Sequence, residues 1–147
     1  MGQVIYVNEA SDVAIVAAIN VPDWEPLLFH SSRHVMEKVV IAGLGTSMQG
    51  SDTTCLLGCN ISNVDAGPDI SQLLSEFRND YARWRTSRFF LLDKVTDFGS
   101  SGAPVVDGAA RVVGMLCVSE YVSVSWALKS DFIKEALDEC VTVPILI

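Results

Sequence analysis

The chain has 147 residues, half of them apolar, and a formal net charge of −8 at pH 7. This length suits one domain with its own hydrophobic core. The acidic balance argues against general nucleic-acid binding, and no apolar run reaches the roughly 18 residues of a membrane-spanning helix. We therefore expect neither a nucleic acid nor a membrane among its partners.

Eight short segments are typical of β-strands, because β-branched and apolar residues in them are bounded by Gly, Asp and Ser corners. They are Val4–Val7, Val13–Ile19, Val39–Ala42, Thr53–Leu57, Phe89–Leu92, Val105–Val106, Arg111–Val118 and Val122–Leu128. Many short strands with such corners favour an all-β barrel or sandwich over a βαβ sheet.

Two segments, residues 69–85 and 130–140, have apolar residues at helical spacing and predict minor helices. Four of the ten basic residues lie in or just after the first of these segments: Arg78, Arg83, Arg85 and Arg88. We interpret them as solvated cations near the C-terminal end of the helix dipole. The alternative is a docking surface for an acidic partner.

The four cysteines, Cys55, Cys59, Cys117 and Cys140, show neither zinc-ligand spacing nor a disulfide framework. Cys117 lies in the apolar run "VVGMLCV", which favours a buried free thiol. The N-terminal stretch "MGQVIYVNEASD" lacks the features of a secretion signal. We expect no metal and no other cofactor, and an intracellular, reducing setting.

The stretch "GSSGAP", residues 99–104, has the features that a serine nucleophile requires. Its glycines permit a tight turn that exposes Ser101, and small residues leave room for a substrate carbonyl. The N–H groups of Gly99 and Ser101 can converge on one point, where an oxyanion would form. Taken by itself, the motif is weak evidence for a nucleophile, because the same residues occur more often in ordinary tight loops.

The wider context resembles the trypsin-like, or chymotrypsin-fold, serine peptidases, especially their HtrA/Deg-type disulfide-free branches. "GSSGAPVVDGAARVVGM" is similar to that family's nucleophile turn and following hairpin, and "SWALKSDFIKEAL" to its last strand and C-terminal helix. "VNEASDVAIVAA" resembles the segment that carries the triad aspartate. The resemblance implies a trypsin-like antiparallel β-barrel fold and runs from about Val4 to Leu137.

The resemblance also implies roles for individual residues. Ser101 matches the nucleophile, Asp12 the acid that orients the base, and the N–H groups of Gly99 and Ser101 the oxyanion hole. Cys117, Val118 and Ser119 match the strand that pairs with an extended peptide or protein substrate. The residues that are candidates to line the specificity pocket are Val95, Cys117 and Ser119.

The family's histidine base has no counterpart at the expected place. It should precede Asp12 by tens of residues, but only eleven residues precede Asp12 and none is His. Both histidines, His30 and His34, fall where the family connects its two barrels. We expect structural roles for them; the alternative is that one acts as a substitute base.

The resemblance therefore predicts three parts. Residues 1–20 would be a remnant of the N-terminal barrel that carries Asp12, and residues 21–34 the connection. Residues 35–147 would be a complete C-terminal barrel with the helical insertion and the closing helix. The truncated first barrel predicts an N-terminal partner chain or self-association.

Two functions from different classes remain open. The first is a serine endopeptidase, or its C-terminal portion, acting by acyl transfer through Ser101. The second is a catalytically inactive pseudoprotease that binds peptides or proteins. Without a base the serine hydroxyl is a poor nucleophile, so we expect this chain alone to be weak or inactive.

Overall fold

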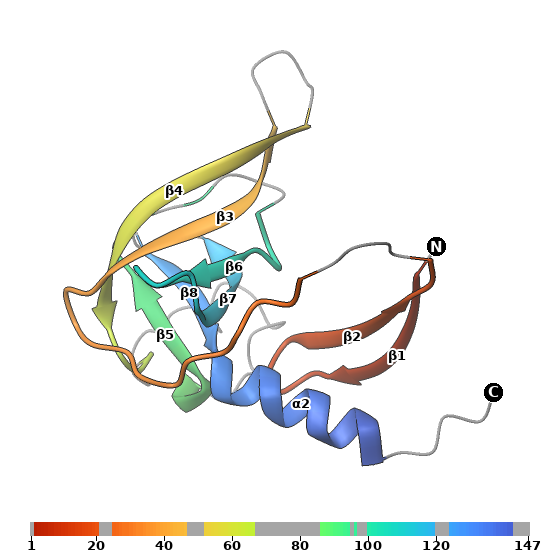
Figure 1. The fold of residues 1–147 in the computed structure, drawn as a ribbon. Coiled ribbons are helices and arrows are strands. Elements are labelled where there is room, and N and C mark those ends of the chain that lie inside the picture. The colour runs from red at the N-terminus through yellow and green to blue at the C-terminus, as the bar shows by residue number, and fades with distance from the viewer. Residues whose placement is uncertain are drawn as a thin grey trace.

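The computed structural model describes residues 2–20, 25–46, 52–66, 86–94, 96, 100–119 and 124–142. Within these ranges, a closed six-stranded barrel, a separate two-stranded sheet and a C-terminal helix make up the fold (Figure 1). The helix expected at residues 69–85 lies outside the described ranges. No helix in the described part is long and apolar enough to cross a membrane.

The barrel strands follow one another around its wall in the order β3-β4-β5-β8-β7-β6. Their bounds are β3 Lys38–Thr46, β4 Asp52–Asn63, β5 Phe89–Leu92, β6 Pro104–Val106, β7 Val112–Ser119 and β8 Ser125–Lys129. All the pairings between them are antiparallel. The trypsin-like antiparallel barrel expected from the sequence is thus confirmed.

The hairpin of β3 and β4 is longer than the sequence predicts. Its pairing runs from Lys38 opposite Asn60 to Thr46 opposite Asp52, and Figure 1 shows it extending past the other barrel strands. The glycine-rich stretch expected as a turn instead continues β3. Gly43 and Gly45 remain in the strand because the cross-strand ladder pairs their backbone groups.

The barrel encloses a core of alternating inward residues, as a half-buried strand requires. Its buried members are Val39, Ile41, Cys59, Ile61, Phe90, Leu92, Ala103, Val105, Val113, Leu116 and Ala127. Close packing makes one glycine of β7 obligatory. A Cβ on Gly114 would lie 2.4 Å from Cε1 of Phe90 and 2.6 Å from the carbonyl oxygen of Leu128.

The two-stranded sheet consists of β1 (Gly2–Asn8) and β2 (Val13–Ala18), and it packs on α2 (Ser130–Thr142) beside the barrel (Figure 1). A second apolar cluster joins these parts. It contains Val13, Ala66, Phe89, Leu91, Cys117, Trp126, Leu128 and Ala136, with Tyr6 and Ile15 at its margin. The Tyr6 hydroxyl also donates a hydrogen bond to Glu139 of α2.

The segment before β3 lies along the start of β7. Val112 donates to the carbonyl of Leu28 at 2.7 Å and accepts from the N–H of His30 at 2.9 Å. Arg33 then reaches the N-terminus of α2, where its side chain is 7% exposed. It donates to the carbonyl of Val113 and to Ser130 Oγ, both at 3.2 Å, so the connection is attached to both barrel and helix.

Candidate active site

Two backbone hydrogen bonds join the turn that carries Ser101 to β7, and a third closes the turn itself. Gly102 donates to the carbonyl of Leu116 at 2.7 Å, and Leu116 donates to that of Ala103 at 2.8 Å. Within the turn, Ala103 donates to the carbonyl of Ser100 at 3.0 Å. Gly102 has a φ of 86°, a backbone region that favours glycine. The tight turn expected at this motif is therefore present, and it exposes Ser101.

A close approach from β3 supports this turn from behind. A Cβ placed on Gly43 would lie 3.0 Å from the Ala103 Cβ and 3.7 Å from the Ser100 Cβ. Ser100 is buried while its neighbour Ser101 is exposed. The missing side chain at Gly43 thus lets the turn at Ser101 pack closely on the barrel wall.

The Ser101 hydroxyl is directed at β7. Its Oγ donates to the carbonyl of Cys117 at 3.1 Å. Cys117 lies where the register between β7 and β8 shifts, between Leu116 and Val118. Such bulges change the direction of a residue relative to the regular ladder. Here the carbonyl of Cys117 accepts the hydrogen bond from Ser101.

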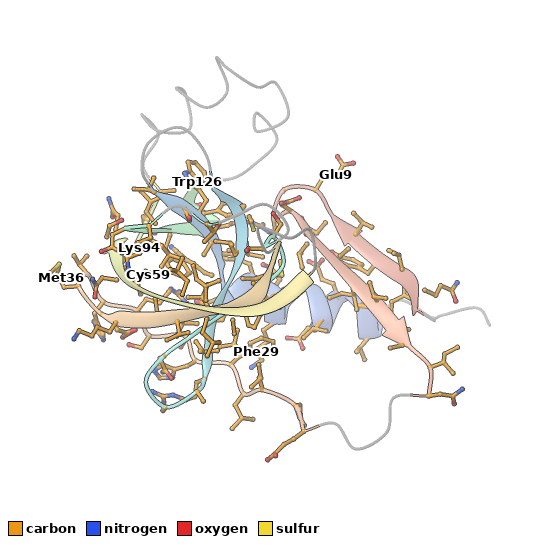
Figure 2. All side chains as sticks on the ribbon, turned by 90° about the horizontal axis from the view of Figure 1, so that it is seen from above. Glu9, Phe29, Met36, Cys59, Lys94 and Trp126 are labelled. Carbon is orange, nitrogen blue, oxygen red and sulfur yellow. The ribbon has the colours of Figure 1, made fainter. Side chains whose placement is uncertain are left out.

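Asp12 approaches the same residue from the other sheet. It lies in the turn between β1 and β2 with a φ of 51°; Figure 2 shows its neighbour Glu9 at the hairpin end next to the barrel. Burial, and then the charge of Asp12, raise the pKa of the Cys117 thiol to about 12. Desolvation in turn raises the pKa of the Asp12 carboxyl above its ordinary value. Asp12 thus acts electrostatically on the thiol of the residue whose carbonyl binds Ser101.

The two histidines lie elsewhere. The backbone of His30 is bonded to Val112, five residues before Cys117 in β7, which corresponds to roughly 16 Å along a strand. His34 is exposed and its Nε2 shares a 3.2 Å hydrogen bond with Ser32 Oγ. No hydrogen bond joins either imidazole to Ser101 within the described ranges.

The remaining candidates divide into two groups. Gly99 and Val95 lie outside the described residues, as do the side chains of Val118 and Ser119. The thiol of Cys117 is buried in the cluster with Val13 and Trp126, so this residue turns only its backbone carbonyl toward Ser101. Residues that could hold a metal ion do not gather in threes anywhere in the described part of the chain.

Sequence reasoning missed Arg88, which it grouped with the cations of a solvated helix face. Its side chain is only 13% exposed. Its Nη1 donates to Ser11 Oγ at 2.6 Å, beside Asp12. The interpretation of Arg88 as solvated was therefore wrong. No spacing in the sequence relates residues 88 and 11, because their contact depends on how the small sheet packs.

A family model described as the trypsin-like peptidase domain matches residues 1–115. The chain belongs to this family. Among curated proteins, none matches.

Solved structures share the fold of this trypsin-like chain. The active form of the Rv3671c protease from M. tuberculosis superposes with a TM-score of 0.68 at 19% identity, over 98% of this chain and 60% of that one. A serine-to-alanine mutant of Rv3671c from M. tuberculosis H37Rv, in an inactive form, gives a TM-score of 0.68 at 22% identity, over 98% and 67%. The present chain thus spans about 60–67% of the length of these structures.

Proposed function

We propose that this chain carries the nucleophile and the acid of a trypsin-like serine endopeptidase, and that a histidine outside these 147 residues acts as the base. One observation carries the proposal: Ser101 donates to the carbonyl of Cys117, and the charge of Asp12 acts on the thiol of the same residue. Side chains from two separate elements thereby interact with one residue of β7. This supports a serine and a carboxylate that share an imidazole placed between them.

The reaction assigns one task to each group. The imidazole takes the proton of Ser101 Oγ as the oxygen attacks the peptide carbonyl carbon. The N–H groups of Gly99 and Ser101 would hold the resulting oxyanion. The C–N bond breaks as the imidazolium returns its proton to the leaving amine, and water then hydrolyses the acyl ester by the same route in reverse. Asp12 orients the imidazole throughout.

The environment of Asp12 supports a base that arrives from outside. Asp12 is exposed, yet partial burial raises the pKa of its carboxyl, and none of the described residues forms an ion pair with it. An N–H donor from an imidazole would stabilise the charged carboxylate by hydrogen bonding. The positions of His30 and His34 on the connection make neither a suitable donor.

The outer face of the small sheet offers a place for the segment that brings this histidine. Val4 and Val16 are cross-strand partners, and they are 57% and 54% exposed. Val7, on the same strand as Val4, is 60% exposed. Two strands alone are marginally stable in water, so further strands from a partner chain, or from a second copy, fit this face.

Imidazole in solution tests the missing base directly. A fluorophosphonate probe reacts with an activated serine, and general-base assistance contributes roughly 10²–10⁴-fold. We expect the chain alone to label slowly and added imidazole to accelerate labelling by about tenfold or more. The Ser101→Ala variant should not label, and Asp12→Asn should lose most of the acceleration.

Imidazole and 1-methylimidazole form a matched pair for this test. Neutral imidazole has one N–H to donate to Asp12 and one bare nitrogen to accept the serine proton, whereas 1-methylimidazole has no N–H. The methylated base should therefore assist much less. Fast labelling without any added base would show that a histidine of the chain serves instead. An absence of labelling under all conditions would favour the pseudoprotease that binds peptides without cleaving them.

A further inference from the structure

Arg88 links the barrel wall, where it lies in the chain, to α2 and to the small sheet. It ends the short 3-10 helix η2 (Thr86–Arg88), immediately before β5 of the barrel. Its guanidinium lies 4.8 Å from the ring centroid of Phe132 in α2 and 3.9 Å from Glu135 Oε2. The same Nη1 donates to Ser11 Oγ at 2.6 Å, which is the shortest of these contacts and the one that crosses to the small sheet.

Ser11 is the residue next to Asp12 and is 1% exposed. Its N–H donates to Asn8 Oδ1 at 3.1 Å, so both its backbone and its hydroxyl are bound. Asp12 itself has a left-handed φ of 51°, and its N–H makes a long 3.3 Å bond to the carbonyl of Glu9. Asp adopts such a conformation more readily than most non-glycine residues, so the hydrogen bonds around the turn, rather than backbone strain, decide where it lies. The bonds to Ser11 are the nearest such restraint.

The proposed nucleophile and acid, Ser101 and Asp12, belong to different sheets. The packing between these sheets therefore determines the distance between the two residues. Ser101 is attached to β7 of the barrel, whereas Asp12 belongs to the β1–β2 hairpin. Apolar contacts of Val13 and Tyr6 in the shared cluster hold the hairpin in place, but they are not directional. A charge-assisted hydrogen bond has a defined length and angle, and the bond between Arg88 and Ser11 supplies one beside Asp12.

We infer that Arg88 is a positioning residue of the active site: through Ser11 Oγ it fixes the Asp12 turn against the barrel and thereby sets the place of the Asp12 carboxylate relative to Ser101. The catalytic consequence rests on the proposed function, but the positioning itself does not. Arg88 touches neither substrate nor reacting atoms. Its partner Glu135 offers a matched control, because that ion pair involves the same guanidinium without touching the Asp12 turn.

The first test needs no enzymatic activity. Carboxyl ¹³C NMR titration of the isolated chain reports the pKa of Asp12, which desolvation holds above its ordinary value. We expect Ser11→Ala and Arg88→Met to return this pKa toward the ordinary value, because the released turn lets the already exposed carboxylate lose its remaining partial burial. Glu135→Gln should leave it raised. An unchanged Asp12 pKa in folded Ser11→Ala overturns the inference, and this variant carries the test if Arg88→Met fails to fold.

The second test uses imidazole-assisted labelling of Ser101. A misplaced Asp12 should lower the maximal labelling rate by about 10- to 100-fold without changing the probe concentration at half-maximal rate. We expect this loss in Ser11→Ala and in Arg88→Met, but not in Glu135→Gln, and a partial recovery in Arg88→Lys. The Ser11→Ala and Arg88→Met losses should not add in the double variant, because both remove one bond.

The two tests separate the two proposals. If the wild-type chain never labels but its Asp12 pKa responds to Ser11→Ala, the endopeptidase proposal fails and the positioning role stands. If wild type labels with imidazole while Ser11→Ala keeps both the raised pKa and the full rate, only the positioning role fails. A loss in Glu135→Gln equal to that in Arg88→Met would also overturn it, since the effect would then belong to general packing of α2.

Discussion

Ser101 and Cys117 are joined by a 3.1 Å hydrogen bond from the serine hydroxyl to a backbone carbonyl. A peptide carbonyl accepts a hydrogen bond but cannot take the proton away, so this contact holds Ser101 without activating it. The same carbonyl lies on the strand that resembles the substrate-pairing strand of trypsin-like peptidases. A base that acts on Ser101, as proposed here, must therefore displace this hydrogen bond.

Replacing Asp12 by Asn should stabilise the folded chain at pH 7. Desolvation raises the folded-state pKa of this carboxyl above 3.8, so the folded state binds the proton more tightly than the unfolded state does. The contribution of this group to the free energy of unfolding is therefore greatest below the pKa of the unfolded state, and it is lost as the pH rises through the pKa of the folded state. Asn also tolerates the positive φ of this turn.

Thermal melts of wild type and Asp12→Asn at a series of pH values check this sign. The melting temperature of the variant should be higher at neutral pH, and the difference should shrink as pH falls toward 3.8. A variant that is less stable at neutral pH would show that the carboxylate makes a favourable contact instead.

Gly114→Ala should destabilise the barrel strongly. The new Cβ would lie 2.4 Å from the Phe90 ring and 2.6 Å from the Leu128 carbonyl oxygen, and overpacking of this kind costs roughly 1–3 kcal/mol or more. Gly58→Ala is the control, since nothing lies within 4 Å of its added Cβ. Urea denaturation should place the midpoint of Gly114→Ala well below that of Gly58→Ala; equal midpoints would contradict the packing described here.

Arg33→Met should loosen the connection from the barrel. The change removes hydrogen bonds to the Val113 carbonyl, Ser130 Oγ and Asp131 Oδ1, and we expect a cost of about 1–3 kcal/mol because the side chain is mostly buried. Arg111→Met removes an ion pair whose arginine is 42% exposed. It should cost about 1 kcal/mol or less, because Asp107 keeps its hydrogen bonds from the N–H groups of Ala109 and residue 111. Chemical denaturation of both variants measures the difference, and a reversed order would refute the assignment.

All four cysteines should be free thiols with unequal reactivity. Burial is the main cause that raises the pKa of Cys59 to about 11 and of Cys117 to about 12, so in the native chain both should react slowly with an alkylating reagent. Cys55 and Cys59 share β4, where positions four apart lie roughly 13 Å apart, too far for a disulfide. Mass spectrometry after alkylation in denaturant without reductant should count four modified thiols; a smaller count would reveal a disulfide.

Val16→Lys should weaken self-association or partner binding without unfolding the chain. Val16 is 54% exposed on the outer face of the small sheet, where an apolar surface favours association. Val35→Lys changes a valine of similar exposure, 53%, on the connection and serves as the control. Light scattering across a concentration series should show a smaller mass only for Val16→Lys; identical masses for wild type and both variants would argue against this face as the contact.

The strands were predictable because short β-branched runs between glycine and aspartate corners encode them locally. Phe89–Leu92 was predicted with its observed bounds. The length of β3 and β4 was not predictable, since the cross-strand ladder extends through residues that by themselves favour a turn. The expected helix at residues 69–85 stays a prediction.

The sequence by itself determined the family, the barrel and the tight turn at Ser101, because a glycine-flanked serine before a strand is a local pattern with a local backbone consequence. Only the tertiary structure decided how Asp12 stands relative to Ser101. It did so through residues with no sequence relation, such as Arg88 against Ser11 and Cys117 between the two sheets. Contacts between separate sheets depend on packing and on the exclusion of water, and neither leaves a periodic trace in the chain.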